Sequence, residues 1–153
     1  QMKYTPSKIN RWMFLKLPAA WLSGVRLTLI DEDKCEVKVR FKWINQNPYR
    51  SMFWAVQGMA AELTTGMLLT KCIQDSNANI SMLLVSNKSS FHKKAVGKIT
   101  FTCSEGKVAK QLINSTIQNI TSRAWLKAKG YDEKGDLVSE FEFEWSCKKR
   151  NNG

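Results

Sequence analysis

The chain has few of the residues that many catalytic and metal sites use. Its one histidine, His92, lies in Phe-His-Lys-Lys and is expected at the surface, so it cannot supply a catalytic network by itself. The cysteines have no paired spacing of the kind that binds zinc, and we expect neither a metal nor a cofactor. They are expected to be buried free thiols in a reducing compartment; the four are Cys35, Cys72, Cys103 and Cys147.

Acidic residues are also scarce, with 13 Asp and Glu against 24 Lys and Arg, a formal net charge of +11. An excess of basic residues can favour binding to nucleic acid, to an anionic membrane or to a phosphate-bearing ligand. The lysines are spread along the chain, and the runs Lys93-Lys94 and 148–150 have no aromatic and basic RNA-binding motif beside them. We therefore expect a solvated positive surface without a nucleic-acid partner, and a phosphate-bearing small molecule as the preferred ligand if the surface binds one.

No stretch has the pattern of a membrane span. Residues 9–22 are amphipathic and are broken by Pro18. The most apolar run, residues 51–69, contains Gln57, Glu62, Thr64 and Thr65. No signal peptide, internal repeat or low-complexity linker is apparent, so residues 1–153 are expected to form one domain in the cytoplasm without membrane insertion.

The apolar run at residues 51–69 predicts the central element of the fold. From Ser51 to Leu69 there is no proline, and Asn47-Pro48 gives a turn before it, with Ser51 or the turn as a cap. Alanine, methionine, leucine and glutamine favour a helix. A helix that is apolar on nearly all sides is buried on most of them. We expect a central helix over 51–70 with one carboxylate, Glu62, in its middle.

Strand patterns flank this helix. Residues 25–30 and 35–43 alternate with period two around a polar turn and predict an antiparallel hairpin. Residues 80–85, 98–103, 122–131 and 137–147 predict four later strands, with a helix inserted at 105–118. In the last strand Phe141, Phe143 and Trp145 should face the helix, and the intervening glutamates should face water. One sheet must then curl around one helix, which is the α+β hotdog architecture.

The first 22 residues predict a helical extension. Ser7 can act as its N-cap, Pro18 ends the helix after Leu17, and one further turn can follow before Gly24. This extension should cover the core. Three aromatic residues in it are expected to pack in that core rather than contact a ligand: Trp12, Phe14 and Trp21.

At Asn47 to Glu62 the chain resembles the PaaI-like branch of hotdog acyl-CoA thioesterases. It is most similar to a bacterial hotdog family of undefined function in which Asn-Pro-aromatic-x-Ser begins this helix, here Asn47-Pro-Tyr-Arg-Ser51. The resemblance covers roughly residues 20–148. It implies hydrolysis of an acyl-CoA-like thioester with no cofactor other than the coenzyme A of the substrate. It also implies a homodimer or tetramer with sites shared between protomers.

The resemblance also implies site residues. Asn47 falls on the asparagine of the thioesterases, and Glu62 falls on their catalytic carboxylate, which acts as general base or nucleophile. Trp54 falls on the first glycine of His-Gly-Gly, whose backbone N–H helps to hold the thioester oxygen. Ser81 lies near a serine that orients water in some relatives. We add Gln57 and Gly58 as candidate substrate contacts beside Glu62.

The sequence departs from the thioesterases at one point. Phe53-Trp54-Ala55 replaces His-Gly-Gly, so the indole stands where those enzymes admit the thioester. Each residue also has a structural alternative: Asn47 as a turn residue, Glu62 as a buried carboxylate paired with a cation or Gln57, Trp54 as core packing. Two functions therefore stay open, an acyl-thioester hydrolase and a non-catalytic hotdog module that binds an apolar ligand or only dimerises.

Overall fold

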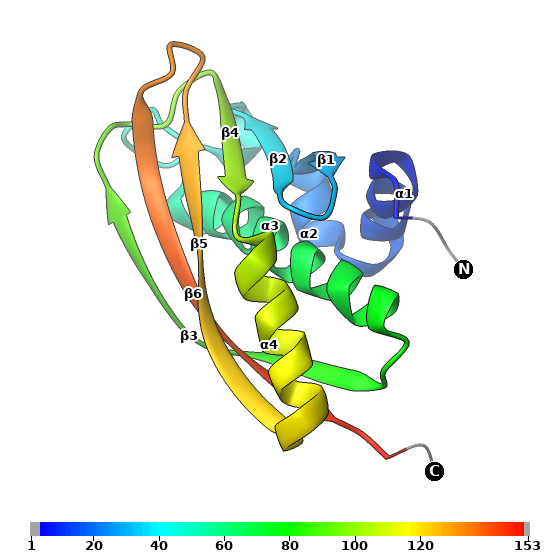
Figure 1. The fold of residues 1–153 in the computed structure, drawn as a ribbon. Helices are drawn as coiled ribbons and strands as arrows, with labels where there is room; N and C mark the ends of the chain where they lie inside the picture. Colours follow the sequence, from blue (N-terminus) through cyan, green and yellow to red (C-terminus); the bar gives the residue numbers. More distant parts are fainter. Residues whose placement is uncertain (1–3, 152–153) are drawn as a thin grey trace.

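A six-stranded antiparallel sheet curves around one long helix in the computed structural model, which describes residues 4–151 (Figure 1). The strand order is β1-β2-β4-β5-β6-β3. The expected α+β architecture, with four strands after the central helix and one helix inserted among them, is confirmed. The strands are β1 (Arg26–Ile30), β2 (Cys35–Arg40), β3 (Ile80–Phe91), β4 (Lys98–Cys103), β5 (Thr121–Tyr131) and β6 (Leu137–Lys149).

The central helix, α3 (Trp54–Ser76), begins and ends later than the sequence predicted. Ser51 does not cap it, because the Ser51 backbone and hydroxyl bond to Asn47 in the preceding turn. Phe53, in an extended conformation, is the N-cap and supplies no side-chain bond. At the other end the helix runs on to Ser76 and stops at Asn77, whose left-handed backbone (φ 56°) closes it.

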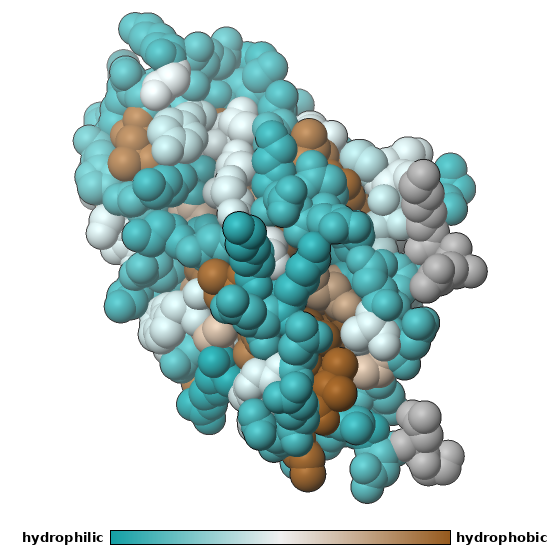
Figure 2. Space-filling view, viewed as in Figure 1, coloured by the Kyte–Doolittle hydropathy of each residue, from teal (hydrophilic) through white to brown (hydrophobic). Residues whose placement is uncertain are grey.

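The inner face of the sheet is apolar and the outer face is charged. Phe141, Phe143 and Trp145 of β6 are buried, as predicted, and α3 packs against this face. On the outer face Lys127 of β5 lies opposite Glu142 of β6 and pairs with it at 3.6 Å. The side of the molecule seen in Figure 2 is correspondingly hydrophilic, with hydrophobic residues in small separate patches.

Two strand boundaries differ from the prediction. The second strand stops at Arg40 rather than residue 43, because Asn45 pulls the chain into a 3₁₀ turn (Trp43–Asn45) by donating to the carbonyls of Arg40 and Ser23. β3 extends past Val85 to Phe91 although residues 86–90 are polar. It does so because β6 pairs along its whole length, across a bulge between Leu84 and Ser86.

Short helices complete the fold. α1 (Pro6–Lys16) and α2 (Pro18–Leu22) form the predicted N-terminal extension, and Thr5 rather than Ser7 caps α1. In Figure 1 they lie across α3 from β5 and β6, while α4 (Gly106–Asn119) lies beside α3. No helix in residues 4–151 combines the length and hydrophobicity that crossing a membrane requires.

The expectation that the cysteines are buried and free is confirmed. All four thiols are buried and free, although Cys35 of β2 lies opposite Cys103 of β4. Burial raises the pKa of Cys103 to about 12 and that of Cys147 to about 11. Because the thiolate is the reactive form, these groups are inert near neutral pH.

Replacing Phe143 with aspartate tests the orientation of β6. The Phe143 ring is 3% exposed and stacks on Phe141 with centroids 5.9 Å apart. A carboxylate there would be buried without a partner, so we expect a loss of about 3–5 kcal/mol of unfolding free energy in urea denaturation. The control is Trp125→Asp on the outer face of β5, where the ring is 40% exposed. Equal losses for the two variants would contradict the assignment of inner and outer faces.

Candidate active site

A tight turn between the 3₁₀ turn and α3 sets the start of the central helix. The side-chain oxygen of Asn47 accepts from the backbone N–H groups of Tyr49 (2.8 Å) and Ser51 (3.2 Å). Its amide nitrogen donates to the Ser51 hydroxyl at 3.0 Å and to the Met52 carbonyl at 3.4 Å. Arg50 adopts a left-handed backbone, φ 61°, within this turn. The structure therefore uses Asn47 as a turn residue, and its amide is already occupied.

The first turn of α3 leaves backbone donors free. Phe53 donates its N–H to the Asn45 carbonyl at 2.9 Å, and the N–H of Val56 reaches back to Phe53 at 3.0 Å. Between them, the N–H groups of Trp54 and Ala55 donate to no other group in residues 4–151. These two donors, at the positive end of the helix dipole, can stabilise a developing negative charge.

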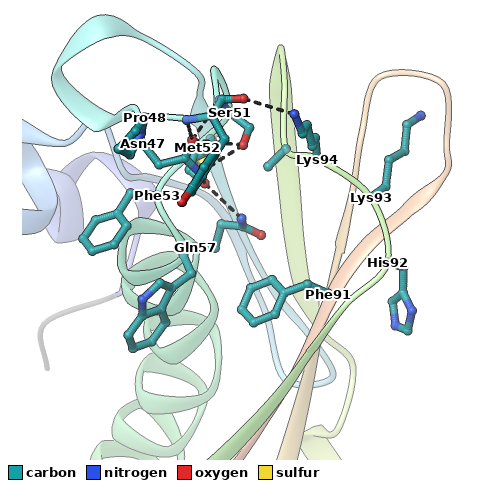
Figure 3. A pocket seen from close by; sticks show the side chains of 13 residues that line it. Asn47, Pro48, Ser51, Met52, Phe53, Gln57, Phe91, His92, Lys93 and Lys94 are labelled. Atoms are coloured by element: carbon teal, nitrogen blue, oxygen red, sulfur yellow. Dashed lines mark hydrogen bonds between the residues drawn. The ribbon is translucent and has the colours of Figure 1, made fainter.

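A cavity of about 540 Å³ opens at this helix start (Figure 3). Asn47, Trp54 and Phe91 are among its lining residues. The Trp54 side chain is 54% exposed, so the alternative in which it packs in the core is wrong. Its indole contacts Phe53 edge to face, with the centroids 6.1 Å apart. Trp54 is therefore available to a ligand in this cavity, and it does not plug the approach to Glu62.

Gln57 lines the same cavity but is held by the protein. Its side-chain oxygen accepts from the Ser139 hydroxyl at 2.7 Å, and its nitrogen donates to the Met52 carbonyl at 3.4 Å. Gln57 is 4% exposed. Figure 3 shows the side chain directed toward Met52. Gln57 thus ties α3 to β6. The structural alternative required Gln57 to hydrogen-bond Glu62, and the side-chain atoms of Gln57 are used elsewhere.

Basic residues on the rim are largely paired. Lys93 binds Asp132 and Asp136, and His92, exposed as predicted, contacts Glu140 at 3.0 Å. Lys94 donates to the Tyr49 carbonyl at 3.2 Å and forms no ion pair within the described residues. Lys94 is therefore a rim cation that remains open to an anionic ligand.

Glu62 lies further along α3 and lines a different cavity, of about 370 Å³. Trp12, Lys16 and Pro18 of the N-terminal extension form one wall, and Met82 and Trp145 of the sheet form another. Eight helical positions separate Trp54 from Glu62, about 12 Å along the axis. A single protomer therefore does not bring Asn47 and Glu62 into one cavity.

The Glu62 carboxylate has no partner within residues 4–151. It forms neither an ion pair nor a side-chain hydrogen bond in that part of the chain. The side chain is half-buried, and desolvation raises the pKa of Glu62 above its ordinary value. A carboxylate with a raised pKa in an accessible cavity is suited to accept a proton near neutral pH. No cation pairs with Glu62 among residues 4–151, so the alternative of a structural ion pair is not supported.

The other candidate residues lie outside this cavity. Gly58 faces Phe141, and a methyl group added to its backbone would lie 3.6 Å from the ring, so Gly58 serves packing between α3 and β6. Ser81 is on the face of β3 opposite Met82, and its hydroxyl accepts from Arg150 at 2.8 Å. Of the small residues near Glu62 in the helix, Gly66 shares its cavity, whereas Ala61 and Thr65 are fully buried.

The residues that sequence reasoning missed belong to the N-terminal extension. Trp12 and Phe14 are 45% and 55% exposed, so the expectation that they are core residues is wrong; Trp21 is partly buried against the core. Ile9 and Met13 already occupy the buried side of α1, so the aromatic rings of Trp12 and Phe14 lie on its other sides. The excess of apolar residues in an 11-residue helix was the available signal.

Glu62→Gln should remove a pH dependence of stability. A raised pKa means that the folded chain binds the proton more tightly than the unfolded chain does. Wild-type stability should therefore fall as pH rises from the ordinary glutamate value, about 4.3, through the raised pKa. The variant should lack this fall and equal or exceed the wild-type melting temperature at pH 7. A lower melting temperature for Glu62→Gln, compared with the surface control Glu142→Gln, would instead indicate a hidden cation partner.

Solved structures with this fold include several proteins named thioesterases. A protein of unknown function from Pseudomonas aeruginosa, named a probable thioesterase, superposes with a TM-score of 0.81 at 18% identity, over 95% of this chain and 97% of its own. A protein of unknown function from Chlorobaculum tepidum gives 0.80 at 14% identity, over 95% and 98%. A thioesterase from Haemophilus influenzae gives 0.75 at 12% identity, over 97% and 93%.

These likenesses establish the hotdog fold that the sequence pattern predicted. No curated protein matches the sequence. One family model does match, and it spans residues 7–147, nearly the whole described chain. The chain therefore belongs to the family described as Domain of unknown function (DUF4442), whose fold here is that of thioesterase-like hotdog proteins.

Proposed function

We propose that this chain hydrolyses an acyl thioester, with acyl-CoA as the substrate class and Glu62 as the general base. The observation that carries the proposal is the environment of Glu62: an accessible cavity of about 370 Å³, no cation partner within residues 4–151, and a raised pKa. The fold shared with proteins named thioesterases supports the same chemistry.

The reaction needs a base and an oxyanion site. The Glu62 carboxylate removes a proton from water while the water oxygen attacks the thioester carbonyl. The oxygen that becomes negative accepts hydrogen bonds from the free N–H groups of Trp54 and Ala55. The C–S bond then breaks, the thiolate takes the proton back from Glu62, and a carboxylic acid is released. Asn47 acts here as a positioning residue, since its amide is used in the turn that aims these donors.

The two halves of this site come from different protomers in the proposal. About 12 Å of helix separates Trp54 from Glu62, which is too far for one carbonyl to touch both. β3 is an edge strand that exposes Leu83 (68%) and Val85 (38%), and unpaired edges of this kind favour pairing with another chain. Joining two sheets at β3 would place the α3 start of one protomer toward Glu62 of the other.

A non-catalytic binding module is the second candidate. The exposed indole of Trp54 beside the 540 Å³ cavity favours it, because an aromatic surface in place of two glycines suits ligand binding more than access for a thioester. In that case acyl-CoA would bind without turnover, and Glu62→Gln would leave binding unchanged.

Thiol release from a panel of acyl-CoAs tests the first proposal. Glu62→Gln and Glu62→Ala should lower kcat at least about 100-fold, the contribution typical of a general base, while circular dichroism stays native. The control is Glu142→Gln, a carboxylate on the outer sheet face, which should keep wild-type activity. The acidic limb of kcat/KM should lie above the ordinary glutamate pKa of about 4.3, because only the ionised form accepts a proton. No turnover by the wild-type chain across the panel would reject hydrolysis.

Light scattering tests the assembly. We expect a dimer at micromolar concentration, because β3 has an unpaired edge and exposed apolar side chains. Leu83→Glu with Val85→Glu should weaken the dimer and lower activity together, since the site would need both protomers. A stable wild-type monomer, or an active monomeric variant, would contradict a shared site.

A further inference from the structure

A second apolar cavity continues from the Glu62 cavity along α3. It measures about 550 Å³ and lies between α1 and the C-terminal half of α3. Trp12, Met67 and Thr70 line both cavities, so the two share a wall made of these side chains. Together they form a groove, here called the α1–α3 groove, that extends from Glu62 past Trp12 toward Tyr4, with Leu15 lining only the second cavity.

The lining of this groove suits a hydrocarbon chain. Trp12 is 45% and Leu15 is 69% exposed, an arrangement that leaves apolar area in water unless a ligand covers it. Among the described residues, no acidic side chain lines the groove beyond Glu62. Three exposed basic residues also line the groove, Lys8, Arg11 and Lys16, and their aliphatic stems can border an apolar ligand while the charges stay in water.

The polar arm of coenzyme A fits this lining less well. Its amides need hydrogen-bond partners, and one of the groove hydroxyls, that of Thr70, already donates to the Gly66 carbonyl at 2.7 Å. A thioester held at Glu62 has two sides, the thiol arm and the acyl chain. The apolar groove therefore matches the acyl side.

The length of the groove sets a chain length. Glu62 and Thr70 are eight residues apart on α3, about 12 Å along the helix axis. Because an extended alkyl chain is a zigzag, each carbon–carbon bond near 1.5 Å advances it by only about 1.25 Å, so about ten carbons cover this distance. A shorter chain would not extend past Thr70, which lines both cavities.

We propose that the α1–α3 groove binds the acyl chain and makes the protein selective for thioesters of about ten or more carbons. This inference rests on the proposed function, because Glu62 marks the position of the carbonyl. Trp12 lines both cavities and covers the middle of the chain, and Leu15 contacts the part of the chain that enters the second cavity. The N-terminal extension is then part of the substrate site rather than only a cover for the core.

A pair of leucine variants tests the groove. Leu15→Asp places a charge in the second cavity, which Glu62 does not line, whereas Leu22→Asp changes a similarly exposed leucine (65%) of α2 that lines neither cavity. Both side chains are exposed, so both variants should fold. Leu15→Asp should weaken binding of dodecanoyl thioester about tenfold and leave hexanoyl thioester unchanged, since each methylene buried is worth about a fourfold change. Leu22→Asp should alter neither. Equal behaviour of the two variants would overturn the proposal.

Chain-length series in the wild-type protein give an independent measure. The KM should fall with each added methylene up to about ten carbons and then level off. The same series with N-acetylcysteamine thioesters, which lack most of coenzyme A, should show the same dependence. If the effect of Leu15→Asp disappears when coenzyme A is replaced, the groove holds the thiol arm and the proposal is wrong.

Binding without turnover separates this inference from the proposed function. Titration calorimetry of hexanoyl-CoA and dodecanoyl-CoA into Glu62→Gln, with and without Leu15→Asp, reports the groove alone. Chain-length-dependent binding that Leu15→Asp abolishes upholds the groove even if no acyl-CoA is hydrolysed. Hydrolysis at Glu62 with no chain-length dependence overturns the groove and leaves the proposed function standing.

Discussion

Two buried hydrogen bonds fix the central helix to the sheet. Ser139 of β6 donates to Gln57 at 2.7 Å, and the Trp145 indole of the same strand donates to Thr65 at 2.9 Å. The surrounding contacts are largely apolar and non-directional, whereas these polar pairs fit in one register. Breaking either would leave a buried polar group unsatisfied. They therefore set where Glu62 and the free end of the helix lie.

The turn at Asn47 sets the other end of the same helix. Its side chain bonds four groups within residues 49–52, and this rigid turn delivers Phe53 as an N-cap that has no side-chain acceptor. A conventional cap would satisfy the first-turn donors, so its absence leaves the N–H groups of Trp54 and Ala55 available. One turn residue thus accounts for both the start of the helix and the donors that the proposed reaction uses.

The N-terminal extension sets the solvent exposure of the Glu62 carboxylate. Trp12 and Pro18 cover the side of α3 that the sheet does not reach, and the cover is incomplete, so the carboxylate is half-buried beside a cavity. Full burial would demand a cation, and full exposure would leave the pKa ordinary. The intermediate position gives Glu62 both a raised pKa and access to a substrate.

The sequence alone determined the order of helices and strands, the buried face of β6 and the position of Glu62 within an apolar helix, because hydrophobic periodicity is local information. It misplaced the start of α3, since the bonds of Ser51 to Asn47 compete with capping. It also placed Trp12 and Phe14 in the core, since apolar character does not reveal which face is already filled. Two features depend on which segments, distant in sequence, contact each other: whether a cation pairs with Glu62, and whether a groove continues from its cavity. The tertiary structure decided these points, because α1, α3 and the sheet enclose Glu62 from parts of the chain that no local pattern connects.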